Sequence, residues 1–418
     1  MNYLPNVVSS SDAGAGVGYT YMNVRGSNSE RINVTINGIP YNDAESHGTF
    51  WVNLGDFASS TQNLQLQRGV GTSTNGSGAF GASLNLLTDA VSDKAYAEIS
   101  NSFGSYNTRK HTIKLSTGLI NEHFEFSGRF SKIDSDGYVD RAFTDLKSYF
   151  LQGVYKDDNT LIKALTFGNK EYTYQSWFGL TAEQLEEDRR QNPYTYDNET
   201  DNYWQDHYQL HWNERFNNNW STNIGLNYTK GKGYFEQYKP EESAEDFGNL
   251  IQENSDVIVR RWLDNNFYVL NAGANFKKNA VDLNFGLSYS SYIGDHFGEI
   301  IWARFASDSE VDERYYNGQG KKKDFNVFAK TTYRLNDKVS LYGDLQMRFV
   351  NYKTAGLTSD RINLLVDEQY NFFNPKAGIT YELDAKNNLY FSYARANREP
   401  SRSDFESNPN IKPEQLND

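Results

Sequence analysis

Apolar and polar side chains alternate along segments of about ten to fourteen residues between Ala95 and Asn397. In the segment 281–293, Phe285, Leu287 and Tyr289 fall on one face and polar residues fall on the other. Because successive side chains of a strand point to opposite faces, this pattern predicts a sheet with one apolar and one polar face. Many such strands in a row, without helices between them, indicate a barrel. The charge on the polar face favours a polar lumen and a lipid-facing exterior.

The alternation predicts thirteen strands. They are 95–104, 109–119, 122–132, 146–156, 160–170, 203–216, 219–230, 266–277, 280–293, 323–335, 338–351, 372–383 and 387–397.

The connections between these strands are short and long in turn. Short polar turns and long loops at opposite ends are typical of outer-membrane barrels, whose long loops are extracellular. Thr181–Gln184 resembles a capping box and predicts a helical turn over 185–190. The long loops are expected at 133–145, 171–202, 231–265, 294–322 and 352–371.

Residues 1–94 follow a different pattern. They are rich in Gly and Ser, and only short strand-like pieces interrupt them. We therefore expect a small separate domain ahead of the barrel. Its predicted strands are 21–25, 32–36, 63–68 and 83–87.

The composition narrows the class of protein. The aromatic share of 15 % fits the aromatic girdles that line both membrane interfaces of a barrel. The net charge of -13 argues against a nucleic-acid partner, because no basic surface is concentrated to neutralise phosphates.

With 0 cysteines, thiol catalysis and thiolate metal sites are excluded. The start, Met1–Pro5, lacks a signal peptide, so either the barrel interpretation is wrong or the chain is a piece of a longer precursor.

Most candidate chemical motifs have a structural interpretation. Gly76, Gly78 and Gly81 match G-x-G-x-x-G, but a strand-like segment follows where a dinucleotide site needs a helix, so a crowded turn is expected. His207 and His211 lie about 13 Å apart on a strand, too far for one metal, and are interpreted as water-exposed lumen residues. Lys321–Lys323 is interpreted as a solvated loop edge. We predict no metal site and no cofactor. We also predict no enzymatic activity, since no nucleophile with a base and an orienting group is recognisable in any one stretch; an active site assembled from distant strands stays open as an alternative.

The loop Asn42–Trp51 is chemically different from the rest of the small domain. It combines carboxylates, an imidazole and aromatic rings. A structural loop and a ligand-facing tip both fit this composition, because rigid scaffolds commonly present function on loops.

Four stretches of the chain resemble TonB-dependent outer-membrane receptors, particularly those of Bacteroidetes. The segment 22–26 resembles the "IRG" segment of the plug, and 34–40 resembles its "V-x-x-D/N-G-I/V-P" strand. The segment 67–86 resembles the glycine-rich run of the plug, with Val70 and Ala82 in place of the usual Pro and Gly. The segment 392–414 resembles the late-barrel signature "S-Y-A…R-x-P-S…L-K-P-E". The plug-motif residues are Arg25, Gly26, Asn37, Gly38, Arg68, Gly69, Gly76, Gly78 and Gly81.

The resemblance implies an all-β protein with a plug and a transmembrane antiparallel barrel. Members have about 22 strands around a plugged lumen. We therefore expect 1–94 to be the C-terminal part of the plug and 95–418 the N-terminal part of the barrel. The chain is expected to be an internal fragment without signal peptide, TonB box, early plug or last strands.

The resemblance also implies an energised importer in the outer membrane of a Gram-negative bacterium. Its expected partners are TonB, reached through a missing N-terminal segment, outer-membrane lipid and a scarce, bulky nutrient: a siderophore, haem, cobalamin or a glycan. A passive porin or structural barrel is the alternative, and a barrel enzyme is the third possibility. Substrate contacts are expected at the tip of the plug, from Tyr41, Asn42, Asp43, Glu45, His47, Phe50 and Trp51.

Overall fold

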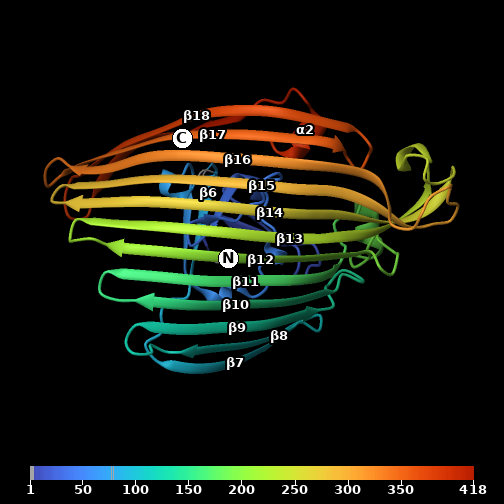
Figure 1. Cartoon of the computed structure of the whole chain (residues 1–418), viewed down its shortest axis with the longest axis horizontal. Coiled ribbons are helices and arrows are strands. Elements are labelled where there is room, and N and C mark those ends of the chain that lie inside the picture. The colour runs from blue at the N-terminus through green and yellow to red at the C-terminus, as the bar shows by residue number, and fades with distance from the viewer. Residues whose placement is uncertain (1–3, 77, 79) are drawn as a thin grey trace.

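A single antiparallel sheet of fourteen strands, here called the wall, dominates the structure (Figure 1). The structure is a computed structural model and describes residues 4–76, 78 and 80–418. Each strand of the wall pairs with its sequence neighbours, in the order β20 to β7. This up-and-down order follows from the short connections, because a tight turn can only join antiparallel neighbours.

The strands of the wall are β7 (Ala95–Phe103), β8 (Arg109–Thr117), β9 (Phe124–Ser135), β10 (Thr144–Lys156), β11 (Thr160–Tyr174), β12 (Thr200–Arg215), β13 (Trp220–Glu242), β14 (Ser255–Lys278), β15 (Val281–Ala303), β16 (Glu313–Arg334), β17 (Val339–Leu357), β18 (Asn363–Glu382), β19 (Asn388–Arg398) and β20 (Glu414–Asn417).

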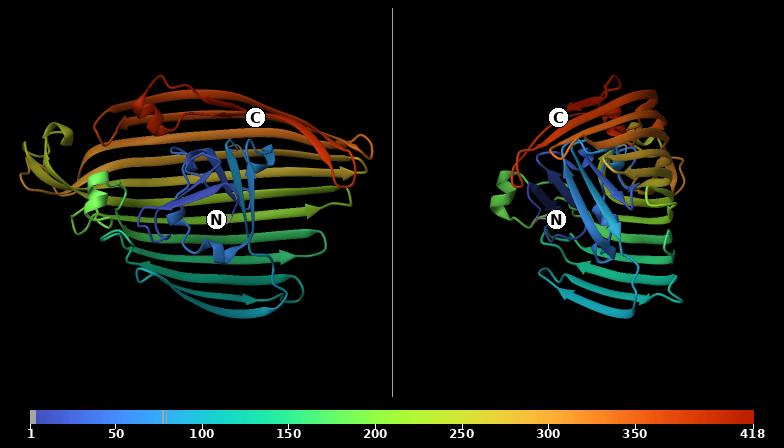
Figure 2. Two further views of the ribbon diagram at one scale, coloured as in Figure 1. Left: turned by 180° about the vertical axis from the view of Figure 1, so that it is seen from behind. Right: turned by 90° about the vertical axis from the view of Figure 1, so that its left-hand side faces the viewer.

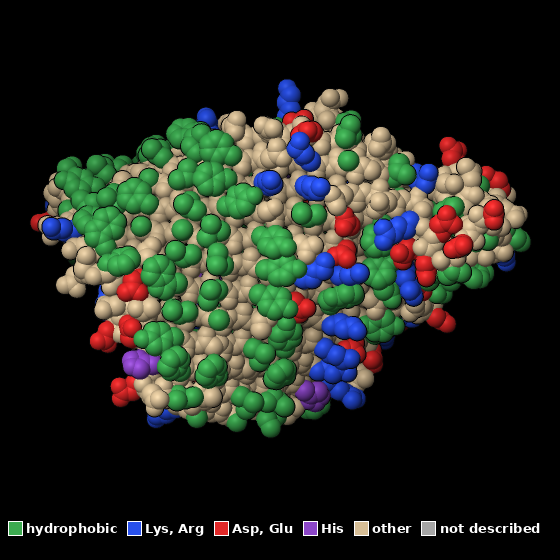
Figure 3. Space-filling view, in the orientation of Figure 1, with side chains coloured by type: hydrophobic (Ala, Val, Ile, Leu, Met, Phe, Trp, Pro, Cys, Tyr) green, Lys and Arg blue, Asp and Glu red, His purple; other side chains and the backbone are tan. Residues whose placement is uncertain are grey.

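The predicted alternation is confirmed along the wall. In β17, Leu345 and Met347 are exposed on the outer face, whereas Gln346 and Arg348 are buried on the inner face. Outward tyrosines stack across neighbouring strands, as in the row Tyr208, Tyr228 and Tyr268. Figure 3 shows hydrophobic side chains over much of this outer face, with Lys and Arg gathered between them and the end that carries the long connections. An apolar band bordered by aromatic and charged residues is what a lipid environment requires.

Two features of the wall correct the sequence prediction. All thirteen predicted strands are present, but a fourteenth, β20, pairs with β19 where no returning strand was expected. Several strands also continue far beyond their predicted ends: β13, β14 and β15 have 23, 24 and 23 residues. The five predicted long connections are correspondingly shorter and occupy 136–143, 175–199, 243–254, 304–312 and 358–362, while 399–413 joins β19 to the unexpected β20.

Residues 4–94, here called the N-terminal region, lie against the concave face of the wall (Figure 2). A parallel pair at the centre and two antiparallel neighbours form its four-stranded sheet, in the order β4-β3-β6-β5. Its apolar core continues into the wall, because Phe57 packs between Phe150 of β10 and Phe167 of β11. The strands are β1 (Val7–Ser11), β2 (Thr20–Val24), β3 (Ile32–Ile36), β4 (Ile39–Pro40), β5 (Thr61–Arg68) and β6 (Ala82–Thr88).

Tight turns in the N-terminal region use the residues of the predicted plug motifs. Asn37 and Gly38 both have positive φ, at 54° and 81°, and close the β3–β4 hairpin. Two successive positive φ values define a type I′ turn, for which Asn-Gly is the preferred pair. Arg25 and Gly26 form a second turn with positive φ.

The glycine-rich run before β6 is a crowded turn followed by a strand, as predicted. At Gly81 a Cβ would lie 2.5 Å from Ser27 Oγ, and Gly76 has a φ of 102°. Gly69 donates its backbone N–H to Gly81, and Arg68 pairs with Ala82 across the β5–β6 ladder. Gly78 approaches the Asn33 side chain, while Ser77 and Ala79 of the motif lie outside the described residues.

The helices are short. Thr181 caps α1 (Ala182–Glu187) through a capping box with Gln184, as the sequence predicted, but the helix covers 182–187 where a turn over 185–190 was expected. A second capping box, from Ser401 to Asp404, starts α2 (Arg402–Ser407). Single-turn 3-10 helices occur at Ser29–Arg31, Trp51–Asn53, Phe57–Ser60, Ser73–Asn75 and Glu245–Phe247. No helix among the described residues is long and apolar enough to cross a membrane.

Candidate functional site

A cavity of about 500 Å³ lies between the tip of the N-terminal region and the inner face of β11–β16; we call it the outer cavity. It lies toward the end of the wall that carries the long connections, since the start of β12 and the end of β11 border it. Aromatic rings dominate its lining. The inward-facing rings are Tyr19, Tyr21, Tyr41, Phe50, Trp177, Tyr203, Phe235, Phe267, Tyr292 and Tyr316.

Four of the predicted substrate residues border this cavity. The ring of Tyr41 lies 5.6 Å from that of His207, and burial raises the pKa of its phenol, which therefore stays protonated. The Phe50 side chain is 42 % exposed. The carboxylate of Asp43 accepts hydrogen bonds from the backbone N–H groups of Glu45 and Ser46, which fixes the turn of the loop. Asn42 also borders the cavity, but its amide holds the loop together through Ile32, His47 and Thr49.

The other three predicted residues face away from the cavity. Trp51 packs against the core of the N-terminal region. Glu45 and His47 insert into the inner face of the wall at β15–β17 and α2. For these two residues, the structure therefore shows contacts with the wall in place of a free, ligand-facing orientation.

Glu45 is 3 % exposed and is held by two side chains of the wall and one of α2. Its carboxylate accepts hydrogen bonds from His296 Nε2 at 2.7 Å and from the Tyr352 hydroxyl at 2.8 Å, and Arg402 lies 3.5 Å away. Burial raises the pKa of Glu45, but the hydrogen bond and charge of His296 together with Arg402 outweigh it and lower the pKa. Gly320 makes room for this carboxylate, because a Cβ there would lie 2.0 Å from Glu45 Oε1.

His47 joins a second buried group of charges. Burial and the neighbouring Lys322 lower the pKa of His47, so its neutral ring accepts a hydrogen bond from the Lys322 ammonium at 2.9 Å. Lys322 also pairs with Glu399 at 2.5 Å, and Arg348 binds Glu399 at 2.7 Å and Asp324 at 2.6 Å. Burial raises the pKa of Glu399, but the two cations hold it well below its usual range. The late network is the set Glu45, His47, His296, Lys322, Asp324, Arg348, Tyr352, Glu399 and Arg402.

Asp56 anchors the opposite side of the N-terminal region. Its carboxylate accepts hydrogen bonds from Lys110, Thr112 and Ser131 of β8 and β9 at 2.6–2.8 Å. Burial raises the pKa of Asp56, but these hydrogen bonds outweigh it and lower the pKa to about 2. We call Asp56 and its partners on β8 and β9 the early contact.

Two predictions about charged and polar residues of the wall are wrong. Lys322 lies within β16 and is 7 % exposed, so Lys321–Lys323 is not a solvated loop edge. His207 is 6 % exposed, and its ring stacks on Phe167 at 4.4 Å. The N-terminal region covers these inward-facing side chains, and the sequence alternation carries no information on what covers the polar face.

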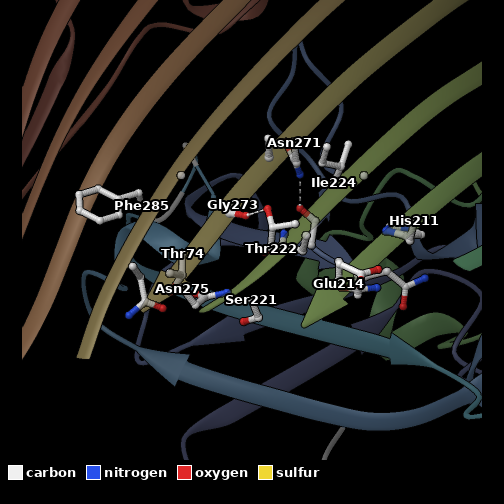
Figure 4. Close-up of a pocket in the computed structure, with 18 of the residues that line it drawn as sticks. Thr74, His211, Glu214, Ser221, Thr222, Ile224, Asn271, Gly273, Asn275 and Phe285 are labelled. Carbon is white, nitrogen blue, oxygen red and sulfur yellow. Dashed lines mark hydrogen bonds between the residues drawn. The ribbon is translucent and has the colours of Figure 1, made fainter. Parts of the chain in front are cut away.

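A second cavity, of about 610 Å³, lies at the end of the wall that carries the short turns; we call it the inner cavity (Figure 4). The Asn271 amide donates a hydrogen bond to the Gly38 carbonyl at 2.8 Å and so joins β14 to the β3–β4 turn. Asn37 of the same turn donates to Gln209 at 3.2 Å. Short polar side chains line much of the remaining surface, among them Thr74, Ser221, Thr222, Asn223, Asn275 and Asn284.

Within the described residues, no group of three or more His, Cys, Asp or Glu side chains is arranged to hold a metal ion. The lining of the outer cavity offers aromatic faces, hydroxyl groups and carboxylates.

Comparison with protein families gives two matches that together span most of the chain. Residues 148–417 match the TonB dependent receptor-like beta-barrel, and residues 1–83 match the TonB-dependent receptor plug domain. The chain belongs to the TonB-dependent receptor family. As members of this family are outer-membrane proteins, the chain is located in the outer membrane of a Gram-negative bacterium.

Solved structures of TonB-dependent receptors share the fold at low sequence identity. The ferric citrate transporter FecA is 15 % identical, with a TM-score of 0.75 over 100 % of this chain and 63 % of that chain. The closed form of the ferric-catecholate import receptor Fiu from E. coli is 15 % identical, with a TM-score of 0.71 over 97 % of this chain and 64 % of that chain. The ferric yersiniabactin receptor FyuA from Yersinia pestis is 11 % identical, with a TM-score of 0.68 over 94 % of this chain and 61 % of that chain.

This TonB-dependent receptor chain therefore spans about three fifths of the length of these proteins. No curated protein sequence matches it.

Proposed function

We propose that the chain forms part of a receptor that captures a scarce, bulky nutrient in the outer cavity and imports it when TonB acts on the N-terminal region. In this proposal, residues 1–94 serve as the plug and residues 95–418 as part of the barrel. The observation that carries the proposal is the shared lining of the outer cavity: Tyr41 and Phe50 come from the N-terminal region, and Tyr203 and Phe235 come from the wall. A molecule bound there would contact both the N-terminal region, on which TonB acts in this proposal, and the wall, which stays in place.

The nutrient class is proposed from the named relatives. FecA is a ferric citrate transporter, Fiu is a ferric-catecholate import receptor, and FyuA is a ferric yersiniabactin uptake receptor. Ferric chelates are therefore the first class to test for this chain, before haem, cobalamin and glycans. The ample aromatic lining supports any of these bulky ligands, because aromatic rings supply large contact area at low entropic cost.

The test uses the full-length receptor in its host. Growth on limiting nutrient is measured with ferric siderophores, haemin, cyanocobalamin or an oligosaccharide, with and without the receptor, and then with and without TonB. We expect receptor-dependent growth on one class that is lost when TonB is deleted or a protonophore is added. Growth that persists without TonB would contradict the proposal and favour a passive porin.

Site variants separate capture from folding. Tyr41→Ala and Phe50→Ala remove aromatic area from the outer cavity, and each is expected to weaken nutrient binding about tenfold or more. Asn275→Ala in the inner cavity is the matched control and should leave affinity unchanged. A deletion of residues 42–51 would be less informative, since it would also remove Glu45 and His47 from the late network.

A further inference from the structure

Two acidic side chains of neighbouring strands come together on the inner face of the wall. Glu171 of β11 and Asp201 of β12 both line the outer cavity, and they are 1 % and 8 % exposed. The Tyr19 hydroxyl lies between them, 2.5 Å from Asp201 Oδ2 and 3.4 Å from Glu171 Oε1. Burial and these two acids raise the pKa of Tyr19, so it is a hydrogen-bond donor with one proton to share.

This acidic pair lacks a cation among the described residues. Neither carboxyl forms an ion pair with a described Lys, Arg or His, and Glu171 Oε2 is buried without any hydrogen-bond partner. Two neighbouring carboxyls are unfavourable when buried, because their charges repel and neither is hydrated. A proton shared between them leaves one negative charge, which a monovalent cation brought from outside would neutralise.

Aromatic rings border the acidic pair. The Trp177 ring packs edge-on against Tyr19, with ring centroids 5.5 Å apart, and against Phe235 at 5.3 Å. The aromatic face carries negative charge density and attracts organic cations. The one guanidinium in the lining, that of Arg261, is stacked on Phe235 at 5.2 Å.

We propose that the outer cavity recognises a ligand with a protonated amine, which binds between Glu171 and Asp201 beside the ring of Trp177. This inference rests on the proposed function, since it names the chemistry of the captured nutrient. An ammonium group supplies the missing charge and up to three donors, enough for Glu171 Oε2 and Asp201 together. A neutral polyol would leave the charge in place, and an anionic ligand would add to the repulsion.

The test uses the receptor in detergent and three probes of one shape: benzylammonium, benzyl alcohol and benzoate. Saturable quenching of tryptophan fluorescence reports binding, and Trp177→Phe identifies the part of the signal that comes from the cavity. We expect benzylammonium to bind at least tenfold more tightly than benzyl alcohol, and benzoate to bind least. The Glu171→Gln/Asp201→Asn double variant should reduce the tenfold ratio to about one.

The control is Glu214→Gln, which removes one carboxylate from the inner cavity, away from the acidic pair. In this control variant, the ratio of benzylammonium affinity to benzyl alcohol affinity should equal that of the unmodified receptor. Three results would overturn the inference: equal binding of benzylammonium and benzyl alcohol, no saturable binding of benzylammonium, or a ratio that survives the double substitution. Displacement of bound benzylammonium by calcium chloride would also overturn the inference, because it would indicate that the acidic pair binds a metal ion.

The two proposals fail separately. Import that depends on TonB, combined with no charge discrimination between the probes, removes the amine inference and leaves the receptor function standing. Growth that is independent of TonB removes the receptor function whatever the probes show.

Discussion

The N-terminal region is fastened to the wall on two sides by different chemistry. At the early contact, one carboxylate, Asp56, gathers donors from β8 and β9, and one of them, Lys110, is partly open to water. In the late network, Glu45 and His47 enter a buried group in which Arg348 and Lys322 each depend on Glu399. An interface built around one carboxylate and an interface built from mutually dependent charges therefore fail in different ways.

The largest effect is expected from Glu399→Gln. The amide keeps the shape of the side chain, but it leaves Lys322 and Arg348 buried with less compensating charge. Breaking a buried ion pair by removing one partner costs about 3–5 kcal/mol. Thermal or urea unfolding of the full-length receptor in detergent measures this loss.

Asp367→Asn is the matched control for that substitution. Asp367 pairs with Lys353 on the outside of the wall, where both side chains are more than half exposed. An exposed pair of this kind is worth about 0–1 kcal/mol. If Glu399→Gln costs no more than Asp367→Asn, the late network does not hold the N-terminal region in place.

A smaller effect is expected at the early contact from Asp56→Asn. The amide keeps one acceptor oxygen, so part of the hydrogen bonding to Thr112 and Ser131 survives, and the partly solvated Lys110 can turn to water. A hydrogen bond to a charged group is worth about 1.5–3 kcal/mol, which sets the expected loss. If Asp56→Asn lowers the free energy of unfolding more than Glu399→Gln in the same assay, the early contact is the stronger of the two attachments.

The smallest effect is the response of the early contact to acid. The pKa of Asp56 in the folded protein, about 2, lies below its ordinary value of 3.8. Its stabilising contribution is therefore fully present above about pH 4 and is lost as the pH falls toward 2. The difference in unfolding midpoint between the unmodified receptor and Asp56→Asn should be constant above pH 4 and shrink below it. A difference that persists at pH 2 contradicts this account.

The sequence predicted the wall better than it predicted the contacts inside it. Alternation located every long strand, because lipid on one side forces apolar residues outward at every second position. Alternation did not predict the ends of β13, β14 and β15 that lie nearest the long connections. There, water on both sides of the sheet no longer enforces the pattern. The four residues of β20 are too few for alternation to be detected.

The candidate site was predicted only in part. The composition of the loop 42–51 identified the tip of the N-terminal region, and Tyr41 and Phe50 do border the outer cavity. The same composition could not show that Glu45 and His47 contact the late network, because a charged loop residue looks alike whether it meets a ligand or a wall. The pair of Glu171 and Asp201 was missed, since only the pairing of β11 with β12 brings these two residues together.

The spacing of these contacts along the chain bears on the order of folding. Asp56 finds Lys110 only 54 residues later, whereas Arg31 meets Glu414 383 residues later. Because distant contacts form late and close long loops at an entropic cost, we expect the N-terminal region to settle on the first strands while the last are still free. The later strands would then assemble around a body already in place, so that the N-terminal region acts as a template for the curvature of the wall.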